Sequence, residues 1–329
     1  MQRKTLLLAT GLAALSTAIA VPAVSAVSAV TVRARIVDGT LRVTGSPSAD
    51  RIALRLSATD PSQLQVDIGA DGSADDTFDI DSFASIVVRA GRGDDFVLLD
   101  TSKGAFTTAK PTTVYGGAGD DTLLGGSGNE TFFGGRGNDF VDGNGGADTA
   151  FLGRGNDTFV WDPGDGSDTV NGGPGFDTHV FNGSGGNEIF AATAVGSHVR
   201  FTRNLGGIVM DLNDVEALDI NALDGTDSTT IGDLAGTGLT DVSVDLANSP
   251  GSDFSDGFAD TVQVEGTAGV DTIAATAEGG AVDVTCLAAS VRIAHTDPAL
   301  DGLTIDSLAG ADDVSVANAV NGLIQVTVK

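Results

Sequence analysis

A nine-residue repeat dominates the middle of this chain. The run Gly116–Leu124 reads G-G-A-G-D-D-T-L-L and has the form G-G-x-G-x-D-x-U-x, where U is an apolar residue. Four further units follow it without a gap, at 125–133, 134–142, 143–151 and 152–160. Such a short period is typical of a solenoid, in which each repeat contacts only its neighbours. We therefore predict one continuous all-β solenoid.

The repeat becomes irregular after residue 160. Trp161 and Asp162 interrupt the period, and Phe181 interrupts it again. We place these insertions at turns, because a stacked solenoid tolerates extra residues there. The resulting frame puts Asn187 at the acid position of the last unit and Ile189 at its inward apolar position.

The first residues have the pattern of a secretory signal. Arg3 and Lys4 precede an apolar stretch from residue 6 to 20, and small residues follow it. The stretch is shorter than the roughly 20 residues that a membrane span needs. We therefore expect cleavage after Ala26 or Ala29 and a secreted, extracellular protein.

The composition favours cations as partners. The formal net charge is −28, which becomes −30 without the signal segment. A chain this acidic repels nucleic acid and anionic membranes, and no later segment is apolar enough for membrane insertion. Aromatic residues make up 5% and glycines number 46, so a bulky core is not expected. Either the chain is disordered, or bound metal supplies what the core lacks.

The repeat provides the chemistry of a calcium site. Ca²⁺ takes 6–8 oxygen ligands from carboxylates, carbonyls and water. Glycines at the first, second and fourth positions permit positive φ, so that the turn can aim carbonyl oxygens at one point, and the acid at the sixth position adds a carboxylate. Each repeat forms half a coil, so alternate repeats stack on the same side. The predicted metal-site residues are Asp121, Asp139, Asp148, Asp157, Asp168, Asp177, Glu130, Asp95, Gly117, Gly119, Gly126, Gly128, Gly135 and Gly137.

These features divide the chain into four segments. Residues 1–29 are the signal peptide, and 30–115 form a degenerate N-terminal solenoid zone in which Ala90–Leu98 is nearly a full repeat. Residues 116–190 form the calcium-binding zone, and 191–329 form a degenerate C-terminal solenoid zone. We expect the two flanks to be poor in calcium.

The sequence resembles the RTX (hemolysin-type) calcium-binding nonapeptide-repeat proteins, most specifically over Gly116–Phe190. The resemblance implies a right-handed parallel β-roll with calcium ions in two rows, secretion, and folding driven by calcium outside the cell. The chain departs from toxin-type members because it has an N-terminal signal and no long apolar pore-forming region.

Three functions remain open. The sequence favours a calcium-binding structural or interaction protein without catalysis. A polysaccharide lyase or epimerase is the first alternative, although no cluster of histidine, acid and aromatic residues supports it. A surface adhesin with a cell-surface or matrix partner is the second, whereas the glycines at position two argue against ice binding.

Two single residues have alternative interpretations. His179 occupies an inward position, where a hydrogen-bonded core histidine is expected rather than a transition-metal ligand. Cys286 is the one cysteine, so no intramolecular disulfide forms, and a buried apolar role is expected rather than a reactive thiol.

Overall fold

The computed structural model describes residues 31–285 and 288–329. The predicted signal peptide and Cys286 lie outside the described residues.

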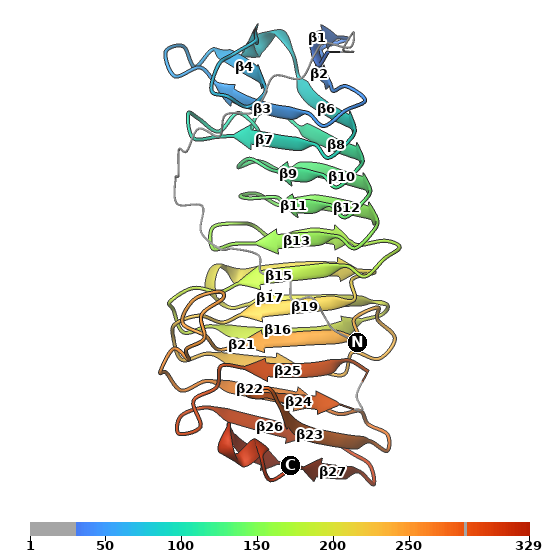
Figure 1. Cartoon of the computed structure of the whole chain (residues 1–329), viewed down its shortest axis with the longest axis vertical. Helices are drawn as coiled ribbons and strands as arrows, with labels where there is room; N and C mark the ends of the chain where they lie inside the picture. The colour runs from blue at the N-terminus through green and yellow to red at the C-terminus, as the bar shows by residue number, and fades with distance from the viewer. Residues whose placement is uncertain (1–30, 286–287) are drawn as a thin grey trace.

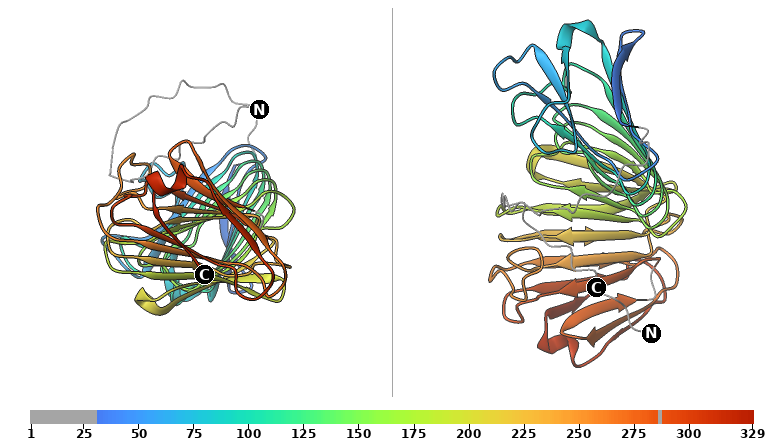
Figure 2. Two further views of the ribbon diagram at one scale, coloured as in Figure 1. Left: turned by 90° about the horizontal axis from the view of Figure 1, so that it is seen from below. Right: turned by 45° about the horizontal axis from the view of Figure 1, so that its top comes forward.

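The described chain winds into a tall stack of strands that forms two long sheets (Figure 1). Each sheet contains 14 strands, and the two sheets face each other along the length of the molecule (Figure 2). Sheet A consists, in spatial order, of β1 (Arg33–Val37), β2 (Thr40–Thr44), β6 (Ser85–Arg92), β8 (Thr112–Ala118), β10 (Glu130–Arg136), β12 (Thr149–Arg154), β14 (Thr169–Asn171), β18 (Ile208–Asn213), β17 (His198–Arg203), β16 (Ile189–Val195), β20 (Ser228–Ile231), β22 (Thr261–Glu265), β26 (Gly302–Asp306) and β28 (Gln325–Val328). Sheet B consists of β27 (Asp313–Val316), β23 (Thr272–Glu278), β24 (Ala281–Thr285), β25 (Ser290–Ala294), β21 (Asp241–Asp245), β19 (Ala217–Asn221), β15 (Thr178–Asn182), β13 (Thr158–Trp161), β11 (Phe140–Asp142), β9 (Thr122–Leu124), β7 (Phe96–Asp100), β3 (Arg51–Leu56), β4 (Gln63–Ile68) and β5 (Asp76–Asp79). Short 3₁₀ turns lie at Ile80–Ser82, Leu205–Gly207 and Val320–Gly322.

The nine-residue period sets the register of the central strands. Successive repeats enter sheet A and sheet B in turn, so two repeats complete one coil. Thr131 in β10 therefore pairs in parallel with Thr149 in β12, 18 residues later. The predicted all-β parallel β-roll is confirmed.

The core lies between the two sheets because side chains alternate across each strand. The eighth repeat positions point inward and are fully buried, at Leu123, Phe132, Val141, Ala150 and Phe159. The prediction for Ile189 was wrong: Ile189 is 56% exposed, whereas Phe190 is fully buried. The insertion before this repeat comprises Phe181 and Asn182, which moves the frame by one residue.

The insertions do not lie at turns, as the sequence had suggested. Trp161 ends β13, and both Phe181 and Asn182 belong to β15. They lengthen neighbouring strands of sheet B, and Trp161 pairs with Phe181. The inserted residues therefore extend the core.

Two antiparallel meanders interrupt the parallel winding. In sheet A, β16, β17 and β18 fold back, so that β18 pairs with β14 and β16 pairs with β20. In sheet B, β23, β24 and β25 repeat this arrangement. Both meanders keep the two-sheet core continuous.

Candidate metal centre

The predicted acids lie in two rows of turns along the edges of the solenoid. We call the turns that lead from sheet A to sheet B the first row, and those that lead from sheet B to sheet A the second row. Asp95, Asp121, Asp139, Asp157 and Asp177 lie in the first row. Glu130, Asp148 and Asp168 lie in the second row.

A ladder of hydrogen bonds joins the acids of the first row. One carboxylate oxygen of each acid accepts the backbone N–H of the corresponding acid one coil earlier. The backbone N–H of Asp121 donates to Oδ1 of Asp139 at 2.9 Å, and that of Asp139 donates to Oδ1 of Asp157 at 2.7 Å. The ladder fixes the orientation of each carboxylate.

The second carboxylate oxygen of these acids is buried without a partner. In the part of the chain that the structure describes, no hydrogen bond reaches Oδ2 of Asp95, Asp121, Asp139, Asp157 or Asp177. Burial of an ionised oxygen without compensation is costly, so the ionised form of these acids needs a cation nearby. This arrangement fits Ca²⁺, which binds carboxylate oxygens together with backbone carbonyls.

The glycines bring the backbones of successive turns into contact. Gly117 and Gly119 have φ of 124° and 128°, a region that disfavours other residues. A Cβ on Gly137 would lie 2.1 Å from the carbonyl oxygen of Gly119, and one on Gly135 would lie 2.3 Å from that of Gly117. The stacked turns therefore place backbone carbonyls close together, as calcium ligation requires.

Gly126 and Gly128 serve a different purpose from the one that we predicted. Neither has positive φ. A Cβ on Gly126 would lie 2.5 Å from Oγ1 of Thr107, and one on Gly128 would lie 2.3 Å from the carbonyl oxygen of Thr107. These glycines are required because the loop that contains Thr107 packs directly on their turn.

The second row has the same hydrogen-bonding pattern. The backbone N–H of Glu130 donates to Oδ1 of Asp148 at 2.6 Å, and that of Asp148 donates to Oδ1 of Asp168 at 2.8 Å. Oε2 of Glu130 accepts the N–H of Gly126, whereas Oε1 of Glu130 and Oδ2 of Asp148 have no partner among the described residues. The longer glutamate side chain thus occupies a regular position in the row.

Burial raises the pKa of these carboxyl groups, and neighbouring carboxylates raise it further. The pKa of Asp121, Asp139 and Asp177 is raised to about 7 in each case, despite the backbone hydrogen bonds that lower it. The pKa of Asp148 is raised to about 9, since it is buried close to Glu130 and Asp168. In the absence of a cation, the rows therefore retain protons near neutral pH.

The remaining predicted acids follow the same trend. Burial raises the pKa of Asp95 to about 6 and that of Asp168 to about 7. Burial also raises the pKa of Asp157 and Glu130. All the predicted acids are thus buried carboxyl groups in the turns.

The sequence interpretation missed several members of the rows. Glu188, not Asn187, holds the acid position of its turn, and its backbone N–H donates to Oδ1 of Asp227 at 2.8 Å. The backbone N–H of Asp227 donates to Oδ1 of Asp260, and that of Asp260 donates to Oδ1 of Asp301. The triplet Gly225-Thr226-Asp227 was the local signal, but its distance from Glu188 does not follow the nine-residue period.

His179 is completely buried beside Phe159 and Phe181. Neither ring nitrogen has a hydrogen-bond partner within the described ranges, so the prediction of a hydrogen-bonded histidine was wrong. Burial lowers the pKa of His179 to about 3.

Across residues 31–285 and 288–329, no three side chains of His, Cys, Asp or Glu converge on one point. The acids lie one to a turn, so a bound metal must take further oxygens from the backbone. The same residues contain no helix of the length and apolarity needed to cross a membrane.

Comparison with known proteins identifies the repeats. The chain matches the RTX calcium-binding nonapeptide repeat in four copies, over residues 113–129, 124–159 and 163–178. No curated protein sequence is similar to the chain. Among solved structures, the extracellular lipase LipA from Serratia marcescens is similar, with 12% identity and a TM-score of 0.17. The match covers 63% of this chain and 43% of the lipase chain, so this chain spans less than half of that protein. The strand topology and the family match together show that the chain carries RTX calcium-binding nonapeptide repeats, which bind Ca²⁺.

Proposed function

We propose that this chain is a secreted calcium-binding structural or interaction protein whose folding is driven by Ca²⁺ in its turns. The observation that carries this proposal is the pair of acid rows, in which one oxygen of each carboxylate is held by the backbone and, in every acid except Asp168, the other is buried without a partner among the described residues. Bound Ca²⁺ supplies the positive charge that these rows lack. Because the rows exist only in the folded chain, calcium stabilises that state.

The ligands in this proposal are the acids of both rows. Asp95, Asp121, Asp139, Asp157 and Asp177 provide carboxylates in the first row, and Glu130, Asp148 and Asp168 provide them in the second. The glycines at 117, 119, 135 and 137 allow the turns to approach closely enough for backbone carbonyls to contribute, whereas those at 126 and 128 allow the loop of Thr107 to pack on their turn. Residues 116–190 form the calcium-binding zone between two flanking zones, 30–115 and 191–329.

Secretion belongs to the same proposal. The basic start, apolar stretch and small residues of positions 1–29 support it. An extracellular location also suits the chemistry, since a weak calcium-driven fold requires a compartment that is rich in calcium. A cell-surface or matrix component is the kind of partner that we propose.

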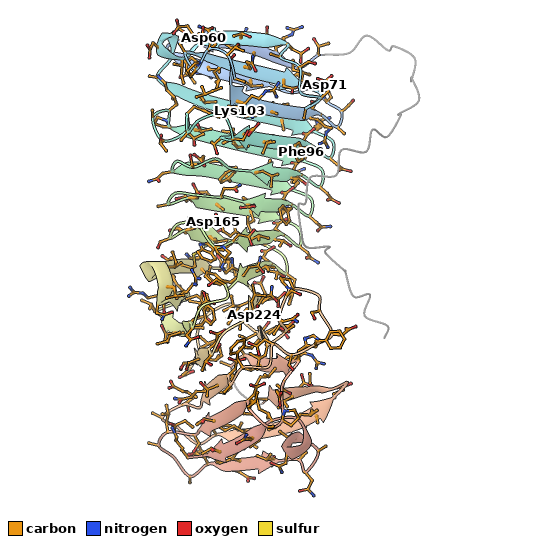
Figure 3. All side chains as sticks on the ribbon, turned by 90° about the vertical axis from the view of Figure 1, so that its left-hand side faces the viewer. Asp60, Asp71, Phe96, Lys103, Asp165 and Asp224 are labelled. Atoms are coloured by element: carbon orange, nitrogen blue, oxygen red, sulfur yellow. The ribbon has the colours of Figure 1, made fainter. Side chains whose placement is uncertain are left out.

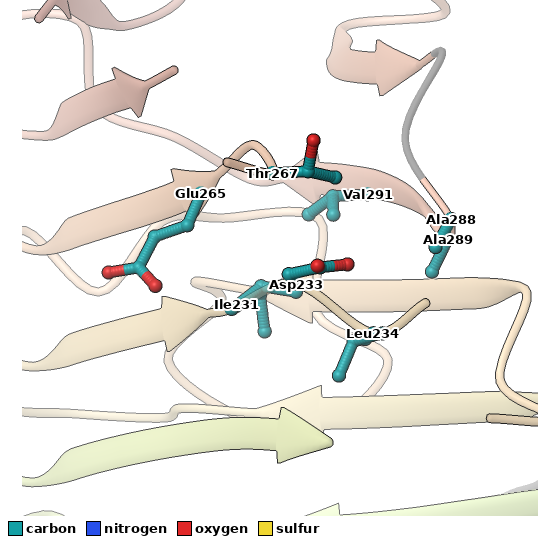
Figure 4. A pocket seen from close by; sticks show the side chains of 9 residues that line it. Ile231, Asp233, Leu234, Glu265, Thr267, Ala288, Ala289 and Val291 are labelled. Atoms are coloured by element: carbon teal, nitrogen blue, oxygen red, sulfur yellow. The ribbon is translucent and has the colours of Figure 1, made fainter. Parts of the chain in front are cut away.

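A catalytic role has less support. A small cavity of about 10 Å³, with room for about one water molecule, lies near the ends of β20 and β22, where Asp233 and Glu265 contribute carboxylates (Figure 4). Its other lining residues are small or aliphatic apart from Thr267, and the lining includes neither a histidine nor a cationic side chain. Such a lining offers no counter-charge for a developing anion and does not favour lyase or epimerase chemistry.

The direct test is a calcium titration of the full chain, followed by far-ultraviolet circular dichroism and calorimetry. We expect the β signal to rise and heat to be exchanged as calcium is added, with magnesium as the control cation. Identical spectra in excess calcium and in chelator would show that folding is not coupled to calcium.

A further inference from the structure

A long segment that follows the tandem repeats lacks positively charged side chains. Residues 204–291 contain 16 aspartates and glutamates but no lysine, arginine or histidine. Several of these acids are nevertheless buried, including Asp227 and Asp260, which are 2% and 1% exposed. Their charge must be balanced by something other than a side chain of this segment.

The turn before Asp227 has the conformation of the calcium-binding repeats. In the repeat 143–151, which contains Asp148, positions two and four are Asn144 and Gly146, with φ of 54° and 129°. The equivalent positions before Asp227 are Leu223 and Gly225, with φ of 69° and 134°. Positive φ is unfavourable for leucine, so the fold imposes this turn against local preference.

This turn also stacks on its neighbour as the repeats do. A Cβ on Gly225 would lie 2.6 Å from the carbonyl oxygen of Gly186, which matches the close stacking of Gly137 on Gly119. The second row therefore continues past the meander through Glu188, Asp227 and Asp260. Asp165 and Asp224 mark its turns along the edge that faces the viewer in Figure 3.

The charge of Glu188 is already balanced by a cationic side chain. The guanidinium of Arg203, from the meander strand β17, forms a buried ion pair with Glu188 Oε1. The hydroxyl of Ser184 donates to the same carboxylate at 2.9 Å, and the N–H of Ser184 donates to Oε2. Arg203 therefore neutralises this turn without metal.

Asp227 and Asp260 have no such partner. Their Oδ1 atoms belong to the ladder, but Oδ2 of each is buried and accepts no hydrogen bond within the described residues. Asp256 contacts the turn that precedes Asp227, since its Oδ2 accepts the N–H of Gly225 at 3.2 Å. Asp301, the next acid in the row, differs because its Oδ2 accepts the N–H of Asp297 at 2.6 Å.

We propose that the carboxylates of Asp227 and Asp260, with backbone carbonyls of the turns 222–227 and 255–260, bind Ca²⁺ at a site separate from the tandem repeats. The acids lie one to a turn, so a cation there takes most of its oxygens from the backbone, which suits calcium. The proposal relies on the same ligand chemistry as the proposed function but on different residues. Arg203 separates this site from the tandem sites in the second row.

The site can be tested in the full chain by hydrogen–deuterium exchange in calcium, magnesium and chelator. We expect calcium to protect peptides that cover 220–231 and 255–265, in addition to peptides from 116–178. If only the tandem peptides respond, the site at Asp227 and Asp260 is overturned and the proposed function stands. If neither region responds, both proposals fail.

Variants then assign the ligands. Asp227→Asn with Asp260→Asn retains the backbone acceptors of the ladder but removes two charged ligands. We expect this double variant to lose calcium protection at 220–231 and 255–265 and to bind fewer ions by calorimetry, while 116–178 still responds. The control Asp233→Asn with Asp253→Asn changes the net charge equally at exposed positions and should behave like the parent. Equal calcium protection and stoichiometry in the two double variants would refute the assignment.

Discussion

Trp161 and Phe181 stack face to face, with ring centroids 4.0 Å apart and ring planes 3° from parallel. Both residues are insertions into the nine-residue period, yet they pair across neighbouring strands of sheet B. The residues that follow them also pair, since Nδ2 of Asn182 donates to Oδ1 of Asp162 at 2.7 Å. Matched insertions in successive coils thus widen the core where the tandem repeats end.

Removal of this stack should destabilise the fold. Trp161→Ala and Phe181→Ala each delete a fully buried aromatic side chain, which costs about 3–5 kcal/mol. Because the rings contact each other, the double variant should lose less than the sum, by about 0.5–1.5 kcal/mol. Urea unfolding in excess calcium measures all three values. Phe176→Ala, at a half-exposed turn position, is the control, and strict additivity would contradict a coupled stack.

The period of the sequence was enough to predict the central coils. A repeat with turn-forming glycines and one inward apolar residue leaves one register, because a shift by one residue would expose Phe132 and bury Thr131. The positions of Asp121, Asp139 and their equivalents in the turns follow from that register. The predicted repeat positions were wrong where residues are inserted, as at Asn187 and Ile189, which lie one position from the predicted ones.

The meanders could not be predicted from local pattern. Buried and exposed side chains alternate along β16, β17 and β18 as they do along the parallel strands. This alternation does not indicate which neighbour a strand pairs with. Because of the meander, Glu188 and Asp227, which are partners in the ladder, lie 39 positions apart in the sequence. The meander also brings Arg203 to Glu188, and no sequence motif indicates this contact.

Asp139→Asn should weaken calcium binding without disrupting the turn. The amide oxygen retains the hydrogen bond from Asp121, whereas the buried Oδ2 is replaced by an amide group that cannot bind a cation. We expect fewer bound calcium ions and a higher calcium concentration at the folding midpoint. Asp120→Asn is the matched control, because the neighbouring Asn138 already makes the equivalent hydrogen bond with an amide oxygen. Similar calcium affinity in both variants would exclude Asp139 as a ligand.

Calcium binding should release protons near neutral pH. Burial raises the pKa of Asp121, Asp139 and Asp177 to about 7, so these groups are partly protonated in the metal-free fold. Between the ordinary pKa of 3.8 and the raised pKa of about 7, the metal-free fold binds more protons than the unfolded chain, so its stability should fall as pH rises through that range and level off above it. Calcium should reverse this trend, because it binds the ionised form. Calorimetry in buffers of different ionisation enthalpy counts the protons, and a buffer-independent enthalpy would contradict the prediction.

His179 should make the protein less stable in acid, an effect opposite in direction to that of the buried carboxyl groups. Burial lowers its pKa to about 3, so the unfolded chain binds a proton below about pH 6.5 that the folded chain does not. The contribution of this group to stability is therefore present above pH 6.5 and declines as pH falls towards 3. His179→Leu should remove that decline while leaving the higher-pH behaviour unchanged. Thermal unfolding in excess calcium from about pH 7 to 5 compares the two proteins, and parallel curves would contradict this role.

Arg203 should act as a fixed substitute for a metal ion. Arg203→Met retains much of the side-chain volume over Trp161 but leaves Glu188 buried without its counter-charge. Loss of one partner of a buried ion pair typically costs about 3–5 kcal/mol, and we expect a loss of this size in chelator. Addition of Glu188→Gln should recover part of it, because the uncompensated charge is then removed. In excess calcium the single variant should regain stability, since Glu188 then presents the same free carboxylate as the other acids of its row. Equal destabilisation with and without calcium would show that Glu188 cannot serve as a ligand even when Arg203 is absent.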